Sequence, residues 1–153
     1  MDTKLREAGW EVNSDNLTYT KGTRPQKGKN IAIAEYPVKQ GRADYALFVG
    51  LQVVGVVEAK RHSKDVSGDI AQAKRYSQNY LIKGDETLCD DRPWGEYKVP
   101  FVFATNGREY LEQLKTKSGI WFCDVRNPYN LSRPLQGWYS PQSLVKLQQN
   151  TCF

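Results

Sequence analysis

Histidine is almost absent from this 153-residue chain, and closely spaced cysteines are missing. The one histidine is His62, and the three cysteines, Cys89, Cys123 and Cys152, form neither a CxxC pair nor a Cys/His pattern with metal-ligand spacing. A structural zinc site is therefore not expected. An odd number of scattered cysteines also favours a reducing compartment, in which disulfides do not form.

Long apolar runs are missing as well. No stretch approaches the roughly 20 apolar residues that a membrane-spanning helix needs, and the N-terminal MDTKLREAGW lacks the apolar core of a signal peptide. The sequence therefore predicts a cytoplasmic protein with no membrane contact. The phosphate-binding motif GxxxxGK[ST] is also absent: residues 22–30 come nearest but have the wrong spacing. Any step driven by ATP would need a motor domain that this chain lacks.

The chain is basic, with a net charge of +5 and a pI of about 9.1. Such a charge suits a polyanionic partner, because lysines and arginines that contact phosphates release condensed counterions. A solvated basic surface with no nucleic-acid partner explains the same composition. With 39% hydrophobic residues, the chain has enough apolar surface for one globular domain over residues 1–153.

The order of apolar periodicities predicts an α/β domain with a mixed β-sheet flanked by helices. Four runs are rich in β-branched and aromatic residues and are expected to be strands, namely residues 31–38, 43–50, 51–60 and 99–105. The last of these is expected to be buried and parallel to the second or the third. Three segments with helical spacing or caps are expected to be helices, namely residues 3–8, 67–80 and 140–149.

Local signals refine this pattern. Ser67 and Ser140 are expected to be helix N-caps, and Pro141 suits the first helical position. The segments 108–116 and 119–125 are separated by Lys-Ser-Gly and predict a β-hairpin. Residues 13–30 have no apolar periodicity and predict a long basic loop that either contacts DNA or is disordered.

Two charged residues follow an apolar strand directly, in Glu58-Ala59-Lys60 after VVGVV. Residues two apart in a strand share a face, so Glu58 and Lys60 project together while Ala59 points to the other side. Charges at the end of a buried strand are costly without partners. Taken alone, the tripeptide is better explained as the solvated end of a strand.

Asp44 opens the preceding strand, and the turn at Gly50 brings it back towards Glu58. A three-residue loop over residues 50–52 would place Asp44 directly opposite Glu58. A two-residue turn would place Asp44 opposite Val57, and a bulge at Gly55 would then restore the match. Both registers predict that the two carboxylates share a face. Oxygen ligands that converge on Mg²⁺, beside a cation that handles the attacking water, suit phosphodiester hydrolysis.

These residues resemble the PD-(D/E)XK nuclease superfamily. Ala43-Asp44 stands where the Pro-Asp pair is usual, Glu58-Ala59-Lys60 follows after 13 residues, and Gln72 and Tyr76 match the QxxxY motif of the RecB-like branch. The i,i+4 spacing places Gln72 and Tyr76 on one helix face. Three longer segments together resemble the nuclease domain at the N-terminus of the restriction (R) subunit of type I restriction-modification enzymes, namely GRADYALFVGLQVVGVVEAKR, DIAQAKRYSQNY and VPFVFATNGREY.

The resemblance spans about residues 1–125 and implies a restriction-endonuclease-like core. It implies that Asp44 and Glu58 bind Mg²⁺ with the backbone carbonyl of Ala59 as a further ligand, and that Lys60 orients or activates water. It also implies that Gln72 and Tyr76 support the site or contact the DNA backbone. Residues 126–153 would then be a C-terminal extension or a linker towards a motor domain.

The function implied is metal-dependent endonuclease cleavage of unmodified foreign double-stranded DNA, together with a motor domain and with methylase and specificity subunits. Two alternatives remain open: a stand-alone repair or recombination nuclease, and a catalytically silent module that binds DNA or a partner. The resemblance also draws attention to Glu7 in the first helix, since related nucleases can carry an acidic residue there. His62 lies in a basic run, residues 60–64, that either meets the DNA backbone or is simply solvated.

Overall fold

The computed structural model describes residues 1–66, 70–88 and 94–149. The predictions for Ser67, Cys89 and Cys152 lie outside these residues. In chain order the elements are α1 (Asp2–Glu7), β1 (Asn30–Val38), β2 (Gly41–Val49), β3 (Gln52–Ala59), α2 (Ile70–Gln78), β4 (Phe101–Thr105), the 3₁₀ turn η1 (Lys115–Lys117), β5 (Ile120–Asp124), β6 (Arg133–Pro134) and α3 (Pro141–Gln149).

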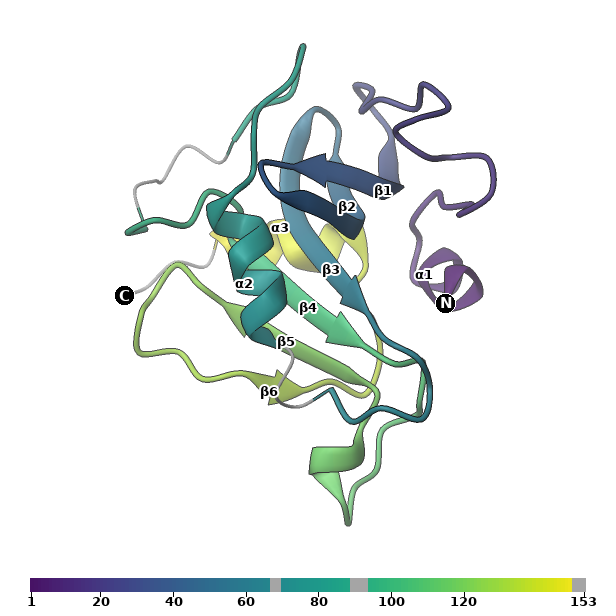
Figure 1. Ribbon diagram of the computed structural model, residues 1–153, viewed down its shortest axis with the longest axis vertical. Helices are drawn as coiled ribbons and strands as arrows, with labels where there is room; N and C mark the ends of the chain where they lie inside the picture. Colours follow the sequence, from purple (N-terminus) through teal and green to yellow (C-terminus); the bar gives the residue numbers. More distant parts are fainter. Residues whose placement is uncertain (67–69, 89–93, 150–153) are drawn as a thin grey trace.

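The six strands form one mixed sheet in the order β1-β2-β3-β4-β5-β6 (Figure 1). Only the β3–β4 pair is parallel, and all the other neighbouring pairs are antiparallel. A parallel pair needs a crossover connection, which here contains α2. The predicted α/β class, the mixed sheet and the parallel placement of residues 99–105 beside the third strand are therefore confirmed.

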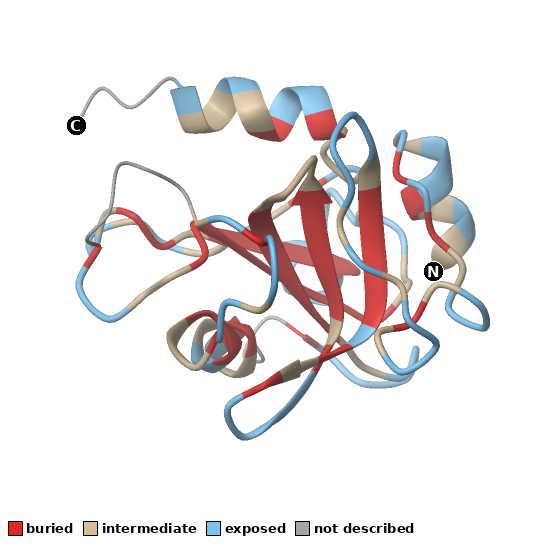
Figure 2. Cartoon of the chain, turned by 90° about the horizontal axis from the view of Figure 1, so that it is seen from above, coloured by how far each residue is buried: buried red, intermediate tan, exposed pale blue. Residues whose placement is uncertain are grey.

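Helices cover both faces of the sheet (Figure 2). One apolar cluster lies between the sheet and α2 and includes Ile70, Ala73 and Tyr76 of that helix. The other lies on the opposite face and includes Leu5 of α1 and Leu144 of α3. Because both faces are covered, the central strands are apolar throughout instead of alternating.

The predicted hairpin of residues 108–116 with 119–125 is wrong. The first segment contains no strand and ends in η1, and residues 111–117 are all exposed. Strand β5 pairs instead with β4 on one side and with β6 on the other. Both of its edges are therefore occupied, so residues 108–116 have no strand edge with which to pair.

The structure of the N-terminal and C-terminal segments agrees better with the predictions made from the sequence. The first helix is displaced by one residue, and the hydroxyl of Ser140 accepts a hydrogen bond from the backbone N–H of Ser143, as expected of an N-cap (3.1 Å). Leu135 and Leu144 are buried in the apolar cluster on the α1 side of the sheet, so these parts of residues 126–149 pack on the sheet. None of the helices in the described ranges is long and apolar enough to cross a lipid bilayer.

The predicted basic loop of residues 13–30 contains no helix, and its only strand residue in the described ranges is Asn30, which begins β1, but it is not disordered. It runs beside the outer edge of β1, where the backbone N–H of Ala34 donates to the carbonyl of Leu17 (3.0 Å) and the N–H of Tyr19 donates to the carbonyl of Ala34 (3.2 Å). Thr18 is buried there. These contacts satisfy backbone groups that an uncovered edge strand would expose.

Candidate functional site

The β2–β3 hairpin places Asp44 beside Glu58 by the second of the two predicted registers. Val49 pairs with Gln52, which leaves a two-residue turn, and the register then shifts by one residue between Phe48 and Leu47. Beyond this bulge the pairing runs towards the site, so that Asp44 and Glu58 are the next residues to oppose each other. The bulge thus re-aims the end of β3 towards Asp44.

Gly55 suits the bulge for a packing reason. A Cβ atom at this position would lie 3.1 Å from Cδ1 of Leu47 and 3.2 Å from Cε1 of Phe103, both closer than ordinary contact. Any side chain here would therefore make Leu47 and Phe103 shift by a few tenths of an ångström. This agrees with the sequence signal, since an isolated glycine within an apolar strand is typical of a bulge.

The predicted site residues converge at the end of β3. Glu58 is buried, with 4% of its surface exposed. One of its carboxylate oxygens accepts a hydrogen bond from the Tyr76 hydroxyl, and the other lies 2.7 Å from the Lys60 ammonium. The Asp44 carboxylate accepts a hydrogen bond from the backbone N–H of Ala59 (2.7 Å). Two carboxylates, an ammonium and a phenol are thus gathered from β2, β3 and α2.

Burial within this site perturbs the titration of Asp44 and Tyr76. Burial raises the pKa of Asp44, and the nearby Glu58 carboxylate raises it further, while the Ala59 N–H and the Lys60 charge act in the opposite direction. Burial and the hydrogen bond to Glu58 likewise raise the pKa of the Tyr76 hydroxyl. Tyr76 therefore stays protonated and donates to Glu58. Perturbed groups of this kind are concentrated at functional sites.

Helix α2 presents Tyr76 to Glu58 because Ala73 and Tyr76 lie on its buried face. Gln72 lies one turn before Tyr76 and is partly exposed. Its side-chain oxygen accepts a hydrogen bond from Arg75, and a hydrogen bond involving Gln72 also influences the pKa of Tyr76. The structure therefore places both residues of the QxxxY pair at the edge of the site, with Tyr76 in direct contact and Gln72 behind it.

Glu35 in β1 is a residue that the sequence did not single out. It has a φ of +53°, and no other non-glycine residue in the described ranges has a positive φ. Ala34 pairs with Tyr45, so the next residues, Glu35 and Asp44, stand opposite each other. Residues two apart in a strand normally share a face, but Ala34 packs on the α1/α3 side and Tyr36 on the α2 side. The positive φ of Glu35 thus reverses the alternation of side chains in β1, so that Ala34 and Tyr36 lie on opposite faces of the sheet beside Asp44.

This backbone conformation gives a direct test. Glu35→Gly is expected to leave the free energy of unfolding within about 1 kcal/mol of the original, because glycine adopts a positive φ without strain. Glu35→Val is expected to lower it by about 1–2 kcal/mol more, because a β-branched residue resists this conformation. Urea unfolding of both variants measures the difference. Equal stabilities would mean that the conformation of Glu35 is not enforced by the fold.

The loop that follows β3, residues 61–65, is held by residues that lie just after β4. Arg108 donates to the carbonyl of His62 (2.7 Å) and forms an ion pair with Asp65 (2.6 Å). Asn106 donates to the carbonyl of Lys64 (2.6 Å). Hydrogen bonds from Lys117 and Arg108 lower the pKa of Asp65, so this anchor stays ionised. The sequence did not predict these ties, which join segments about 40 residues apart and leave no periodic signal.

Glu7 and His62 lie apart from the cluster of Asp44, Glu58 and Lys60. The His62 side chain is exposed, and only its backbone carbonyl takes part in the ties to Arg108. Glu7 is exposed on α1 and lines a cavity with Trp138, on the side of the sheet opposite α2. Within the described ranges, neither side chain forms a hydrogen bond or ion pair with Asp44, Glu58 or Lys60.

Comparison with known proteins agrees with the resemblance drawn from the motifs. A family model described as the type I restriction enzyme EcoKI endonuclease subunit, second domain, matches residues 11–148. The type I restriction enzyme EcoKI endonuclease subunit of Escherichia coli (strain K12) is 40% identical over 176 aligned positions. These positions cover 96% of this chain but 15% of that relative. No solved structure was found to match.

Proposed function

We propose that this chain, which belongs to the family of the second domain of the type I restriction enzyme EcoKI endonuclease subunit, is a metal-dependent DNA endonuclease domain. Its sheet and helices would form a restriction-endonuclease-like core of the PD-(D/E)XK type. One observation carries the proposal: the Asp44 and Glu58 carboxylates and the Lys60 ammonium converge at the end of β3.

The donor set fits Mg²⁺. Within the described ranges no group of three or more His, Cys, Asp or Glu side chains is placed to hold a metal. The proposed protein ligands are the two carboxylates of Asp44 and Glu58. Magnesium is usually bound through one or two carboxylates, with waters and substrate phosphates completing its coordination. The backbone carbonyl of Ala59 would be a further ligand. Burial raises the pKa of Asp44 and the Glu58 carboxylate raises it further, and a bound cation would oppose both effects by favouring the ionised form.

A divalent cation held there would polarise a phosphodiester and make bound water more acidic. The chain's own residues would do the rest. Lys60, now paired with Glu58, would orient the attacking water and stabilise charge on the phosphate. Tyr76 would keep Glu58 in position through its hydrogen bond, with Gln72 supporting Tyr76 or contacting the DNA backbone. The loop of residues 61–64 lies on the same edge and would contact backbone phosphates.

The wider role is proposed from the family. The chain spans 15% of the length of its relative, so a motor domain that uses ATP would belong to the longer subunit, with residues 126–153 leading towards it. Double-stranded, unmodified foreign DNA would be the substrate, and methylase and specificity subunits would be the partners. The domain itself would cut with little sequence preference, because phosphate contacts carry no sequence information.

Plasmid nicking by the purified chain tests the proposal. Cutting is expected with Mg²⁺ or Mn²⁺ and not with EDTA. Lys60→Ala is expected to cut at least about 100-fold more slowly, since positioned proton-transfer and water-orienting groups contribute at least this much. Lys146→Ala on the exposed side of α3 removes the same charge far from the site and should cut normally.

Four results would contradict the proposal. Cutting in EDTA would show that cleavage needs no divalent metal. Unchanged cutting by a folded Lys60→Ala variant would show that Lys60 does not take part in cleavage. Selective cutting of junctions or flaps would favour a stand-alone repair nuclease. DNA binding without cutting, both alone and with motor and methylase partners added, would identify a non-catalytic binding module.

A further inference from the structure

A chain of hydrogen bonds in α2 leads from the protein surface to Glu58. Arg75 is exposed, and its guanidinium donates to the side-chain oxygen of Gln72. Burial raises the pKa of the Tyr76 hydroxyl, and a hydrogen bond with Gln72 opposes this rise, as a donor to the phenol oxygen does. Tyr76 in turn donates to Glu58. An exposed arginine is therefore connected to a buried carboxylate through two side chains.

The arginine sets the direction of these hydrogen bonds. A guanidinium has five N–H donors and no acceptor. Because Arg75 faces the oxygen of the Gln72 amide, the nitrogen of that amide is left to donate to Tyr76. The Tyr76 hydroxyl hydrogen is then left for Glu58. With the Gln72 amide turned over, its NH₂ group would meet another donor, so Arg75 selects the orientation in which Tyr76 holds Glu58.

The charge of Arg75 has no carboxylate partner in the described ranges. Helix α2 contains Lys74 and Arg75 but no acidic residue. The exposed carboxylate of Glu96 reaches the side chain of Gln78, one turn further along the helix, and not Arg75 (3.4 Å). The exposed side of α2 beside the site is therefore positively charged.

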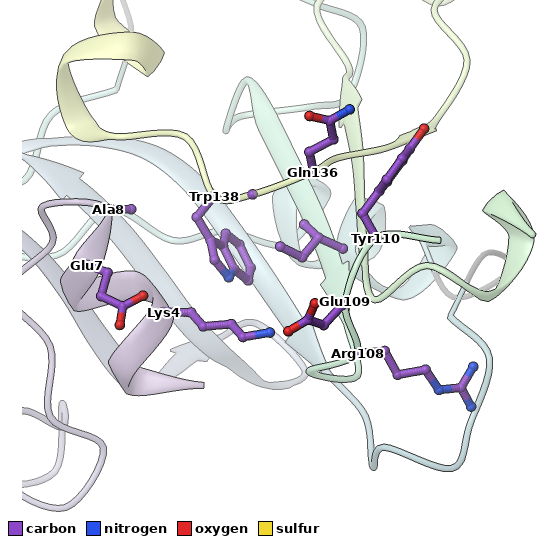
Figure 3. A pocket seen from close by; sticks show the side chains of 10 residues that line it. Lys4, Glu7, Ala8, Arg108, Glu109, Tyr110, Gln136 and Trp138 are labelled. Carbon is purple, nitrogen blue, oxygen red and sulfur yellow. The ribbon is translucent and has the colours of Figure 1, made fainter. Parts of the chain in front are cut away.

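The cavity on the other face of the sheet has no such excess of charge. It has a volume of about 430 Å³ and lies between α1, the segment after β4 and the segment before α3 (Figure 3). Its charged lining residues are two cations and two carboxylates, namely Lys4, Arg108, Glu7 and Glu109. Their charges balance, so that cavity favours neither an anion nor a cation, whereas the exposed side of α2 favours an anion.

We propose that Arg75 binds a backbone phosphate of the DNA beside the bond that is cut, while it keeps its hydrogen bond to Gln72. The inference rests on the proposed function, because it takes DNA to lie at Asp44 and Glu58. One N–H of the guanidinium is used by Gln72, which leaves others for paired hydrogen bonds to phosphate oxygens. A phosphate bound there fixes Arg75 and, through Gln72, the hydrogen bond that holds Glu58. Contact with DNA thus orders a proposed metal ligand.

DNA binding without cleavage tests the phosphate contact. Binding of a duplex is measured in EDTA over a series of salt concentrations. Arg75→Gln is expected to bind about tenfold more weakly and to reduce the slope of log K against log salt concentration by about 0.9, the value for one phosphate contact. Arg75→Lys keeps the charge and should keep the slope. The matched control is Lys74→Gln, which removes the same charge from the same helix and should leave the slope unchanged.

Lys74 is a suitable control because it lies on another side of α2. Burial raises the pKa of the Cys123 thiol in β5, and the Lys74 charge acts in the opposite direction, so Lys74 is directed towards β5. An unchanged slope for Arg75→Gln would overturn the proposal. An equal fall for Lys74→Gln would overturn it as well, because the charge of the whole helix would then explain the effect. Failure of the original chain to bind the duplex would have the same consequence.

NMR tests the connection to Glu58. Adding the duplex in EDTA should shift the side-chain amide resonances of Gln72, and Arg75→Gln should abolish this shift. The side-chain amide of Gln142, exposed on α3, should not respond. With Mg²⁺ and saturating DNA, Arg75→Gln should also cut about tenfold more slowly, because groups that orient a metal ligand contribute about this much, and Arg75→Lys should restore the rate.

The outcomes separate this inference from the proposed cleavage. A Gln72 amide that does not respond to DNA would overturn the connection between Arg75 and Glu58. The expected changes in slope and in the Gln72 resonances, without cutting by any form of the protein, would support the phosphate contact and contradict the nuclease function. Cutting by the original chain and by Arg75→Gln at equal rates and with equal salt dependence would do the reverse.

Discussion

Replacing Asp44 with asparagine is expected to reduce metal-dependent DNA cleavage about 1000-fold while making the fold more stable. The loss corresponds to about 4 kcal/mol of transition-state stabilisation, the size expected when a metal ligand is weakened. The gain in stability follows from the raised pKa of Asp44, caused by burial and then by Glu58. The folded state disfavours the ionised carboxylate, so a neutral amide removes a cost. Asparagine keeps the side-chain oxygen that accepts the Ala59 N–H.

The sign of this effect depends on pH. When folding raises the pKa of a carboxyl group, the folded protein loses stability as pH rises from the unfolded pKa through the folded pKa. The asparagine variant lacks this loss, so it is expected to be the more stable protein at neutral pH. Both proteins should become equally stable in acid, where Asp44 is protonated folded and unfolded. The gain at neutral pH is expected to be on the order of 1 kcal/mol, as is common when functional sites are neutralised.

Plasmid cleavage and urea unfolding of the same preparations measure both effects. Asp15→Asn changes an exposed aspartate and should alter neither. Reduced stability of the Asp44→Asn variant would show that the ionised Asp44 carboxylate stabilises the fold. Undiminished cleavage would remove Asp44 from the proposed metal site.

The pairing of Asp44 with Glu58 was within reach of the sequence because strand geometry is regular. Counting residues from the Gly50 turn left two registers, and Gly55 within the strand indicated the bulge that restores the match in one of them. The placement of Lys60 beside Glu58 then followed from the two-residue period of a strand, whereas the place of Tyr76 at the site was implied only by the family resemblance.

Other features depend on tertiary contacts that leave no local signal. The positive φ of Glu35 is imposed by two strands that turn over together, and glutamate itself gives no indication of it. Residues 108–116 were predicted to form one strand of a hairpin, but Leu111 and Leu114 are exposed and β5 already pairs on both edges. Strand propensity describes how well a residue fits a sheet and cannot indicate whether an edge is available.

A second buried acid, Glu86, is expected to make the fold less stable as pH rises. Its side chain is 6% exposed and accepts hydrogen bonds from Tyr36 of β1 and from Tyr80 just after α2. The two tyrosine rings stack in parallel, 5.8 Å apart. Burial raises the pKa of Glu86 from 4.5 to about 7, against the opposing effects of the Lys83 backbone N–H and of Arg24.

The direction follows from proton linkage. Between pH 4.5 and about 7 the folded state holds a proton on Glu86 that the unfolded state has released, so stability falls as pH rises and levels off above that range. Glu86→Gln removes this titration while keeping an oxygen for one tyrosine and an amide for the other. The variant is expected to be more stable than the original at pH 8 by about 1–3 kcal/mol, and to lose this advantage towards pH 4.5.

Urea unfolding at a series of pH values, with Glu112→Gln as an exposed control, isolates the contribution of Glu86, because all other groups titrate alike in the compared proteins. Parallel stability curves for the original and Glu86→Gln would show that Tyr36 and Tyr80 stabilise the ionised carboxylate enough to cancel its burial. A lower stability of the variant at every pH would show instead that the carboxylate fixes β1 to the end of α2 in its charged form. Tyr76 and Tyr80 lie four residues apart and each donates to a buried glutamate. The Glu86 contact therefore also helps to hold the helix that presents Tyr76 to Glu58.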